Sequence, residues 1–226
     1  VRRERAAKAA EYFSRNAEHW DRIRSLHVPD ADVEAALLDM IGREPVGSFL
    51  DIGTGTGRLL ELMSPRYERS VGVDTSREML SIARAKLDAA GLGHATVRQG
   101  DAYRLPVPRA TFELATLHQV LHYLDDPASA VREAAAALVP GGRLAIVDFA
   151  PHNVEVLRSE HAHLRLGFSQ GTLKAFVEAA GMEVETVRSL PPDASAVDAL
   201  TVVILVARRP ISNLSVDASA RSFEVA

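Results

Sequence analysis

A glycine-rich segment has the residue types needed to bind a small polar ligand. Residues 49–60 read FLDIGTGTGRLL, between an apolar run and a stretch with helical spacing. Glycines allow a tight turn and the close approach of a ligand, and the N-terminus of a following helix favours negative or polar groups. Asp51 precedes the loop and suits hydrogen bonding to a cationic amine. We interpret the segment as a ligand-binding loop; the alternative is a generic glycine-rich turn.

The glycine spacing disfavours a dinucleotide site. That fingerprint requires G-x-G-x-x-G, whereas the glycines here stand at positions 53, 55 and 57 and are followed by Arg58. An NAD-dependent oxidoreductase is therefore the weaker interpretation. Asp74 ends the next apolar segment, 21 positions after Gly53. An acid about 20 residues after the loop can accept hydrogen bonds from ribose hydroxyls. The alternative for Asp74 is a surface acid at a strand end.

Several ionisable residues follow the later apolar segments. His118 and His122 come after one, and Asp148 and His152 come after the next. Ligands of open α/β sheets bind outside the carboxyl ends of the strands, so we expect His118 beside a cofactor and His122 near a substrate. Histidine titrates near neutral pH and suits a catalytic base. The alternative is that these side chains only form hydrogen bonds at the rim of the sheet and take no part in a reaction. The His118–His122 spacing matches no established zinc pattern, and we predict no metal site.

Short apolar segments alternate with helical periodicity along the chain. We predict helices at residues 1–25, 32–41, 57–64, 76–90, 127–138 and 169–180, and strands at 46–52, 70–73, 95–99, 112–117, 143–149, 182–189 and 200–207. This alternation predicts an α/β fold with helices on both faces of a mostly parallel sheet. Because only a short proline-containing segment joins the last two strands, we expect an antiparallel pair at the sheet edge.

The composition is that of an ordinary soluble domain. The chain has 226 residues, 47% of them hydrophobic and 25% charged, with a net charge of −4. This charge does not mark a nucleic-acid binder by itself. The absence of cysteine excludes disulfides, thiolate metal ligands and thiol nucleophiles within this chain. No apolar run approaches the roughly 20 residues of a membrane helix, and residues 1–13 have no signal-peptide core, so we expect a cytoplasmic location.

Four motifs, in order, resemble those of class I methyltransferases that depend on S-adenosylmethionine (SAM). They are LDIGTGTG at residues 50–57, VDTSREML at 73–80, QGDA at 99–102 and LVPGGRL at 138–144. The resemblance covers about residues 46–207. It implies a Rossmann-like sheet of seven strands with one antiparallel edge strand, a fold that agrees with the strand pattern.

The resemblance also implies a cofactor site. In this superfamily the acid at Asp74 binds ribose, Met79 packs beside adenine and Asp101 meets the adenine amino group. The expected cofactor-binding residues are Asp51, Gly53, Thr54, Gly55, Gly57, Asp74, Thr75, Met79, Gly100, Asp101, Ala102 and His118. Methyl transfer mainly requires alignment of the nucleophile with the methyl group, and a base helps only when the nucleophile arrives protonated. His122, His152 and Asp148 are the catalytic candidates.

We divide the chain into a helical lid or linker at residues 1–45, a SAM-binding domain at 46–209 and a flexible, small and polar tail at 210–226. Tyr12, Phe13 and Trp20 fall near helical spacing. We expect this lid, with Tyr12 and Trp20, to cover cofactor and substrate; apolar packing is the equal alternative. The lid and the edge strands offer surfaces for a homodimer, although nothing in the sequence demands one.

Two flanking pieces resemble the methyltransferase half of bacterial regulators that begin with an ArsR-type winged helix: residues 12–27, and residues 148–152 together with 160–168. The resemblance implies an N-terminal DNA-binding domain in a longer protein, with residues 1–5 as the end of a linker helix. A chain that begins with Val1 fits a fragment or a processed protein. The chain is also similar to ubiquinone and menaquinone C-methyltransferases and to arsenite methyltransferases. Because the arsenite enzymes hold arsenic with cysteines, their chemistry is excluded.

Two functions follow from the resemblance. The first is a methyltransferase that uses SAM, releases S-adenosylhomocysteine (SAH) and acts on a small molecule. The alternative is a SAM- or SAH-binding sensor domain of a transcriptional regulator. Both would use the same cofactor residues. They differ at the substrate face, where an open pocket with ordered His122, His152 and Asp148 favours the enzyme and a closed face favours the sensor.

Overall fold

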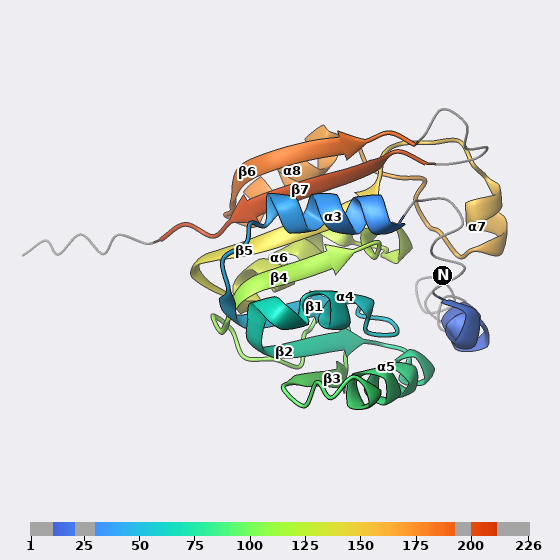
Figure 1. Cartoon of the computed structure of the whole chain (residues 1–226). Helices are drawn as coiled ribbons and strands as arrows, with labels where there is room; N and C mark the ends of the chain where they lie inside the picture. The colour runs from blue at the N-terminus through green and yellow to red at the C-terminus, as the bar shows by residue number, and fades with distance from the viewer. Residues whose placement is uncertain (1–10, 21–29, 193–199, 212–226) are drawn as a thin grey trace, which may run out of the picture.

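A seven-stranded sheet forms the centre of the computed structural model, which describes residues 11–20, 30–192 and 200–211 (Figure 1). The strand order is β3-β2-β1-β4-β5-β7-β6. The strands are β1 (Val46–Ile52), β2 (Tyr67–Asp74), β3 (Ala95–Gln99), β4 (Phe112–His118), β5 (Leu138–Phe149), β6 (Glu183–Leu190) and β7 (Val202–Arg208). β7 runs antiparallel to both of its neighbours, and the pairs from β3 to β5 are parallel. The predicted seven-stranded, mostly parallel sheet is confirmed, with β7 inserted between β5 and the edge strand β6.

Helices cover both faces of this sheet. The described α-helices are α3 (Asp30–Met40), α4 (Arg58–Leu62), α5 (Arg77–Ala89), α6 (Pro127–Ala137), α7 (Val156–Glu160) and α8 (Gln170–Ala179), with short 3-10 helices η1 (Ala17–His19), η2 (Ser64–Arg66) and η3 (Leu121–Tyr123). One apolar cluster joins α6 and α8 to the sheet, and a second joins α3, α4 and part of α5 to the opposite face. In Figure 1, α3 and α4 lie in front of the sheet and α6 and α8 behind it.

Strand β5 contributes side chains to the apolar clusters on both faces of the sheet. Leu144 and Ile146 belong to the cluster with α6 and α8, whereas Ala145 and Val147 belong to the cluster with α3 and α4. All four side chains are fully buried. Successive strand residues point to opposite faces, and a parallel sheet covered on both faces therefore reads as a continuous apolar run.

Local capping chemistry begins the helices around the sheet. The side chains of Ser76, Asp126 and Ser169 accept hydrogen bonds from backbone N–H groups three residues later, at 3.2, 3.1 and 3.0 Å. Such caps satisfy donors that have no partner within a helix. Gly91 and Gly181 follow α5 and α8 with φ of +68° and +76°, a backbone conformation that ends helices and favours glycine. These signals explain why the predicted helices at 76–90 and 169–180 agree closely with the structure.

Some predicted boundaries were wrong. β5 begins at Leu138 rather than at residue 143, because the Pro140-Gly141-Gly142 turn is accommodated as an irregularity where pairing with β4 shifts register. Gly141, at φ +82°, donates its N–H to the Arg209 carbonyl at 2.8 Å. α7 was not predicted. Of the helix predicted at 1–25, residues 11–16 are helical and η1 follows; residues 1–10 and 21–29, and the tail from residue 212, lie outside the described residues.

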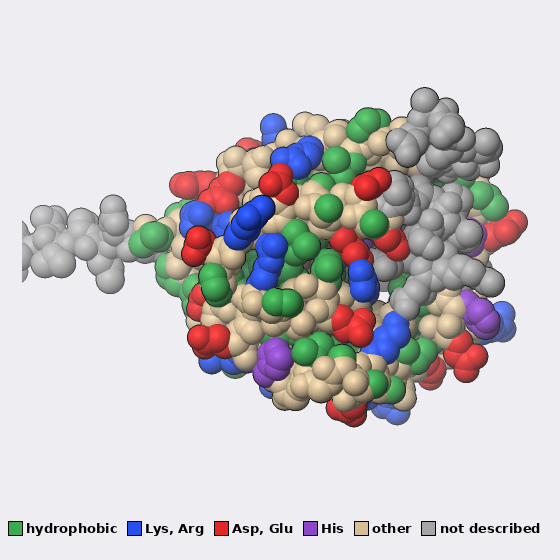
Figure 2. Space-filling view, in the orientation of Figure 1, with side chains coloured by type: hydrophobic (Ala, Val, Ile, Leu, Met, Phe, Trp, Pro, Cys, Tyr) green, Lys and Arg blue, Asp and Glu red, His purple; other side chains and the backbone are tan. Residues whose placement is uncertain are grey.

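Charges of both signs are interspersed over the face in Figure 2, without a broad basic patch. This mixture agrees with the small net charge of the chain, −4. Across the described ranges, no helix combines the length and apolar character that a membrane span requires.

Candidate functional site

A cavity of about 950 Å³, including its open mouth, lies where β1, β2 and β4 end. The lining residues are Phe13, Trp20, Asp51, Ile52, Gly53, Thr54, Gly55, Thr56, Arg58, Leu59, Val73, Asp74, Thr75, Met79, Gly100, Asp101, Ala102, His118, Gln119, Val120, Tyr123 and Leu124. They include every expected cofactor-binding residue except Gly57. At Gly57, φ is +85° and an added Cβ would lie 3.2 Å from Ala83 Cβ, so this glycine allows α4 to pack on α5.

The glycine loop is tied to β2 and pressed against the segment after β4. The N–H groups of Gly53 and Thr54 both donate to the Val73 carbonyl, at 2.7 and 3.0 Å. Gly53 has φ +74°, and a Cβ there would approach Val120 Cγ2 to 2.3 Å. Glycine is therefore required at position 53 by both backbone angle and space.

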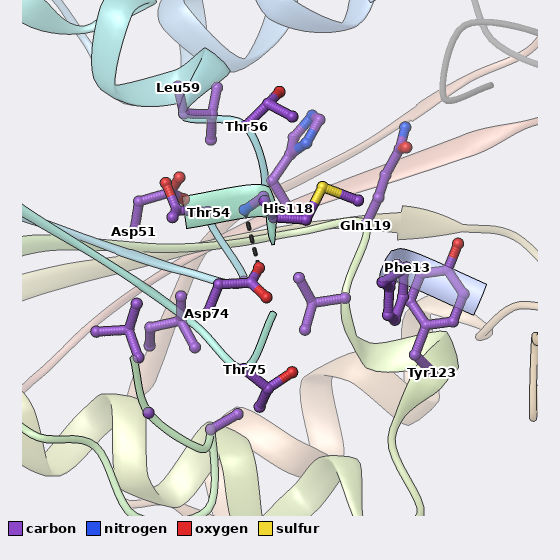
Figure 3. A pocket seen from close by; sticks show the side chains of 18 of the residues that line it. Phe13, Asp51, Thr54, Thr56, Leu59, Asp74, Thr75, His118, Gln119 and Tyr123 are labelled. Atoms are coloured by element: carbon purple, nitrogen blue, oxygen red, sulfur yellow. Dashed lines mark hydrogen bonds between the residues drawn. The ribbon is translucent and has the colours of Figure 1, made fainter. Parts of the chain in front are cut away.

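Asp74 joins the loop to the start of α5. Its Oδ2 accepts the Gly55 N–H at 2.9 Å, drawn in Figure 3, and its Oδ1 accepts the Ser76 N–H at 2.9 Å. Burial raises the pKa of Asp74, and backbone hydrogen bonds from Ser76, Gly55 and Thr75 oppose that rise. An ionised carboxylate has about four acceptor positions. The carboxylate thus retains capacity for hydroxyl donors of a ligand.

Two further carboxylates face the same cavity. Asp51 is buried, and its Oδ1 accepts the Thr116 hydroxyl at 2.6 Å, which fixes the carboxylate at the end of β1. Asp101 is exposed, and its Oδ1 accepts the Tyr103 N–H at 2.9 Å. The Gly100 N–H donates to the Asp74 carbonyl at 2.9 Å. Three carboxylates therefore line the cavity beside the glycine loop.

Three aromatic side chains form another part of the lining, here called the aromatic wall: Phe13, Trp20 and Tyr123. Phe13 makes edge contacts with both others, at centroid distances of 5.3 Å to Trp20 and 4.9 Å to Tyr123. Trp20 Nε1 lies 3.4 Å from the position of a Cβ on Gly55, so this ring covers the loop. The lid residue Trp20 thus lies at the cavity.

Tyr12, the other expected lid residue, does not line the cavity. Its hydroxyl and His161 Nδ1 form a hydrogen bond of 2.8 Å, and its ring contacts Trp20 at a centroid distance of 6.4 Å. Burial raises the pKa of Tyr12 to about 12. Tyr12 therefore holds the N-terminal segment against the residue that follows α7.

The catalytic candidates lie outside the cavity lining. His122 and Asp148 are 1% and 0% exposed, with Nδ1 and Oδ1 2.8 Å apart. The His122 ring packs on Tyr123 at a centroid distance of 4.0 Å, behind the aromatic wall. His152 Nδ1 accepts the Val154 N–H at 3.2 Å. Catalytic roles for His122, His152 and Asp148 stay predictions.

His118 lines the cavity, and its position beside a cofactor stays a prediction. Within the part of the chain that the structure describes, no three His, Asp or Glu side chains form a group that could hold a metal ion.

The segment after β4 supplies lining residues that sequence reasoning missed: Gln119, Val120, Tyr123 and Leu124. The neighbouring histidines drew attention to this stretch, but no local signal marked these four side chains. Gln119 has φ +55°, which turns the backbone at the end of β4. A glutamine at positive φ cannot be foreseen from residue type, because glycine, asparagine and aspartate usually occupy such positions.

Residues 50–146 match the family described as "Methyltransferase domain". The chain is 35% identical over 105 residues to "Uncharacterized methyltransferase YcgJ" of Bacillus subtilis, which covers 46% of this chain and 42% of that protein. It is 32% identical over 143 residues to "Demethylmenaquinone methyltransferase" of Thermus thermophilus, which covers 62% of this chain and 64% of that protein. The chain therefore spans less than two thirds of either relative.

A solved SAM-dependent methyltransferase from Mesorhizobium loti superposes with a TM-score of 0.65 and 22% identity, covering 77% of this chain and 96% of that one. At this identity the likeness shows the fold. The carboxylates at 51, 74 and 101 also suit the amine, ribose hydroxyls and adenine amino group of SAM. The chain therefore carries a match to the methyltransferase domain family over residues 50–146 and has the Rossmann-like fold of SAM-dependent methyltransferases.

Proposed function

We propose that this chain transfers a methyl group from SAM to a small molecule and releases SAH. The arrangement of three carboxylates around the glycine loop, next to an aromatic wall, carries the proposal. SAM presents an amine, two ribose hydroxyls and an adenine amino group, and all of these donate hydrogen bonds. Asp51, Asp74 and Asp101 supply matching acceptors in one cavity.

When bound, SAM supplies an electrophilic methyl group on a positively charged sulfur. Asp51, held by Thr116, would receive the amine, and Asp74 would receive the ribose hydroxyls. Met79 and Ala102 would pack against the adenine. The faces of aromatic rings attract cations, so the aromatic wall is suited to lie near the sulfonium and to exclude water.

The other residues that line the cavity would mainly align the methyl acceptor with the methyl group of SAM. Burial raises the pKa of Tyr123 well above its usual range, with smaller contributions from Tyr12 and Asp148. Tyr123 would therefore stay protonated and donate a hydrogen bond rather than act as a base. For an acceptor that arrives protonated, His118 would take the proton at the cavity. His122 and Asp148 would position Tyr123 from behind.

Calorimetric titration with SAM and with SAH tests the cofactor site first. Incubation with SAM and a metabolite extract, followed by measurement of SAH, then tests transfer. We expect binding of both ligands and SAH release that depends on the extract. Binding without turnover would replace the enzyme with a SAM- or SAH-binding sensor. Absence of binding by a folded chain would overturn the assignment of the loop.

A further inference from the structure

Residues 11–20, here called the cover segment, connect the two sides of the cavity. On one side, η1 packs beside α5 and Trp20 lies over the glycine loop at Gly55. On the other side, Phe13 contacts Tyr123 at a centroid distance of 4.9 Å. In Figure 1 the cover segment lies, in blue, between α5 and α7. It therefore joins the proposed cofactor position to the aromatic wall.

A hydrogen bond fastens the cover segment to the chain that follows α7. The Tyr12 hydroxyl and His161 Nδ1 lie 2.8 Å apart, although the two residues are 149 positions apart in the sequence. Their rings also meet edge to face at a centroid distance of 6.0 Å. Burial raises the pKa of Tyr12 to about 12, so the hydroxyl keeps its proton at neutral pH and can donate it to Nδ1. Neither residue lines the cavity.

The chain that carries His161 is itself attached to the body of the protein. The N–H groups of Leu164 and Arg165 both donate to the His122 carbonyl, at 2.9 and 3.2 Å. Arg165 Nη2 also donates to the Asp125 carbonyl at 2.8 Å. These two carbonyls belong to the segment after β4, which supplies part of the cavity lining. His161 therefore gives the cover segment a fixed partner outside the cavity.

The cover segment restricts the path of a ligand at the glycine loop. Trp20 Nε1 lies 3.4 Å from the position of a Cβ on Gly55, so the indole lies directly against the loop. A ligand bound by the loop could leave on this side only after Trp20 moves away. The Trp20 ring contacts Phe13 at a centroid distance of 5.3 Å and Tyr12 at 6.4 Å. These contacts link the three rings, and Trp20 is expected to move together with Tyr12.

We propose that the hydrogen bond between Tyr12 and His161 is a latch that holds Trp20 over the glycine loop and thereby limits the rates at which SAM enters and SAH leaves. This inference rests on the proposed function, because it takes the cavity as the cofactor site. Tyr12 and His161 are positioning residues that act through Trp20. Because both lie outside the cavity lining, the latch should form with and without ligand. An interaction that is equal in two states does not shift the equilibrium between them, so loss of the latch should change both rates and leave Kd unchanged.

Stopped-flow mixing with SAH, followed through Trp20 fluorescence, measures both rate constants. Tyr12→Phe removes the hydroxyl and keeps the ring. We expect association and dissociation to become faster together by about fivefold, as loss of one hydrogen bond allows. His161→Ala should have the same effect, and the double variant no larger one, because either change removes the whole bond. His161→Asn, whose Oδ1 can accept from the Tyr12 hydroxyl, should keep the wild-type rates.

Arg15→Ala is the matched control on the same segment. Arg15 is exposed and pairs with Glu11 one helical turn away, and such surface pairs contribute little. This variant should keep the wild-type rates. Amide hydrogen exchange of residues 11–20, measured without ligand, reports opening of the segment directly. Exchange should become faster by about fivefold in Tyr12→Phe, because one hydrogen bond is lost, and should stay unchanged in Arg15→Ala.

The outcomes separate the latch from the proposed function. Unchanged SAH rates in Tyr12→Phe, or effects that add in the double variant with His161→Ala, would overturn the latch. A loss of SAH affinity caused by faster dissociation alone would overturn it too, because Tyr12 would then support the bound ligand specifically. If the wild type fails to bind SAH, the proposed function fails, and hydrogen exchange still shows whether the hydrogen bond holds the cover segment in place.

Discussion

The Gly55 N–H donates to Asp74 Oδ2 at 2.9 Å, which joins the loop after β1 to the end of β2. The same carboxylate accepts the Ser76 N–H at the start of α5. One side chain therefore orders the two segments that line the proposed cofactor position. Asp74 is expected to contribute to SAM binding both directly and by holding the loop.

Substitution Asp74→Ala should weaken SAM binding by about tenfold or more. Each charge-assisted hydrogen bond to ribose is worth about 1.5–3 kcal/mol, and about 1.4 kcal/mol corresponds to tenfold in affinity. Calorimetry measures the change. Asp88→Ala is the control, because Asp88 is an exposed aspartate near the end of α5. Equal affinities for the two variants would contradict the role of Asp74.

The affinity for SAM should fall as the pH falls through the pKa of Asp74, which burial raises. The protonated carboxyl accepts hydrogen bonds poorly, so ribose hydroxyls favour the ionised form. The folding stability of the free protein depends on pH in the opposite direction. The stability linked to a raised acid pKa is present at low pH and is lost as the pH rises through the pKa of the folded state. SAM titrations at neutral pH and at about pH 4 test this, with circular dichroism as the folding control. Equal affinities at both pH values in folded protein would exclude linkage to Asp74.

Gly55→Val should abolish SAM binding while the sheet stays folded. Gly55 has φ +52°, and its added side chain would project toward Trp20 across the ligand position. Gly91→Val is a matched control: Gly91 has φ +68°, and an added Cβ would meet nothing within 4 Å. Both variants should lose comparable stability from the left-handed backbone, and only Gly55→Val should lose binding. Normal binding by Gly55→Val would remove the loop from the cofactor site.

Trp20 should report ligand binding through its fluorescence. It is the only tryptophan of the chain, it lines the cavity and it lies over Gly55. We expect SAH to change the emission intensity or wavelength in a saturable titration whose affinity equals the calorimetric value. Trp20→Phe should remove the signal and still bind SAH. A wild-type emission that stays constant at saturation would place the ligand away from Trp20.

Asp148→Ala should destabilise the protein by about 3 kcal/mol or more, as expected when one partner of a buried pair is removed. Asp148 Oδ1 accepts from the Phe149 N–H at 2.8 Å and pairs with His122 Nδ1 at the same distance. The substitution would therefore leave both of these groups buried without their hydrogen bond to Asp148. Asp39→Ala removes an exposed pair with Arg188 and should cost less than about 1 kcal/mol. Urea unfolding compares the two variants. Similar losses of unfolding free energy in the two variants would show that the buried pair stabilises the protein no more than the exposed pair does.

Local signals made much of the fold predictable. The strand predicted at 46–52 agrees with β1, where a mostly apolar segment is bounded by Pro45 and Gly53. The strand predicted at 95–99 agrees with β3, which lies between Gly93 and Gly100. The glycine loop and Asp74 were recognisable because their spacing follows from the geometry of one β-α-β unit. The expected winged-helix domain, the homodimer and the cytoplasmic location stay predictions.

The sequence by itself determined the α/β class, the glycine loop and the positions of Asp51 and Asp74, since these depend on periodicity and on residues near each other in the chain. Asp101 was expected only from the resemblance to class I methyltransferases. Tertiary structure alone decided that β7 lies between β5 and β6, that His122 and Asp148 pair behind Tyr123, and that Gln119 is among the residues that line the cavity. Each of these arrangements depends on packing between segments distant in sequence. A buried polar pair, or a glutamine with a left-handed backbone conformation, is stable only where the surrounding structure holds it in place. The local sequence pattern does not show whether such surroundings exist.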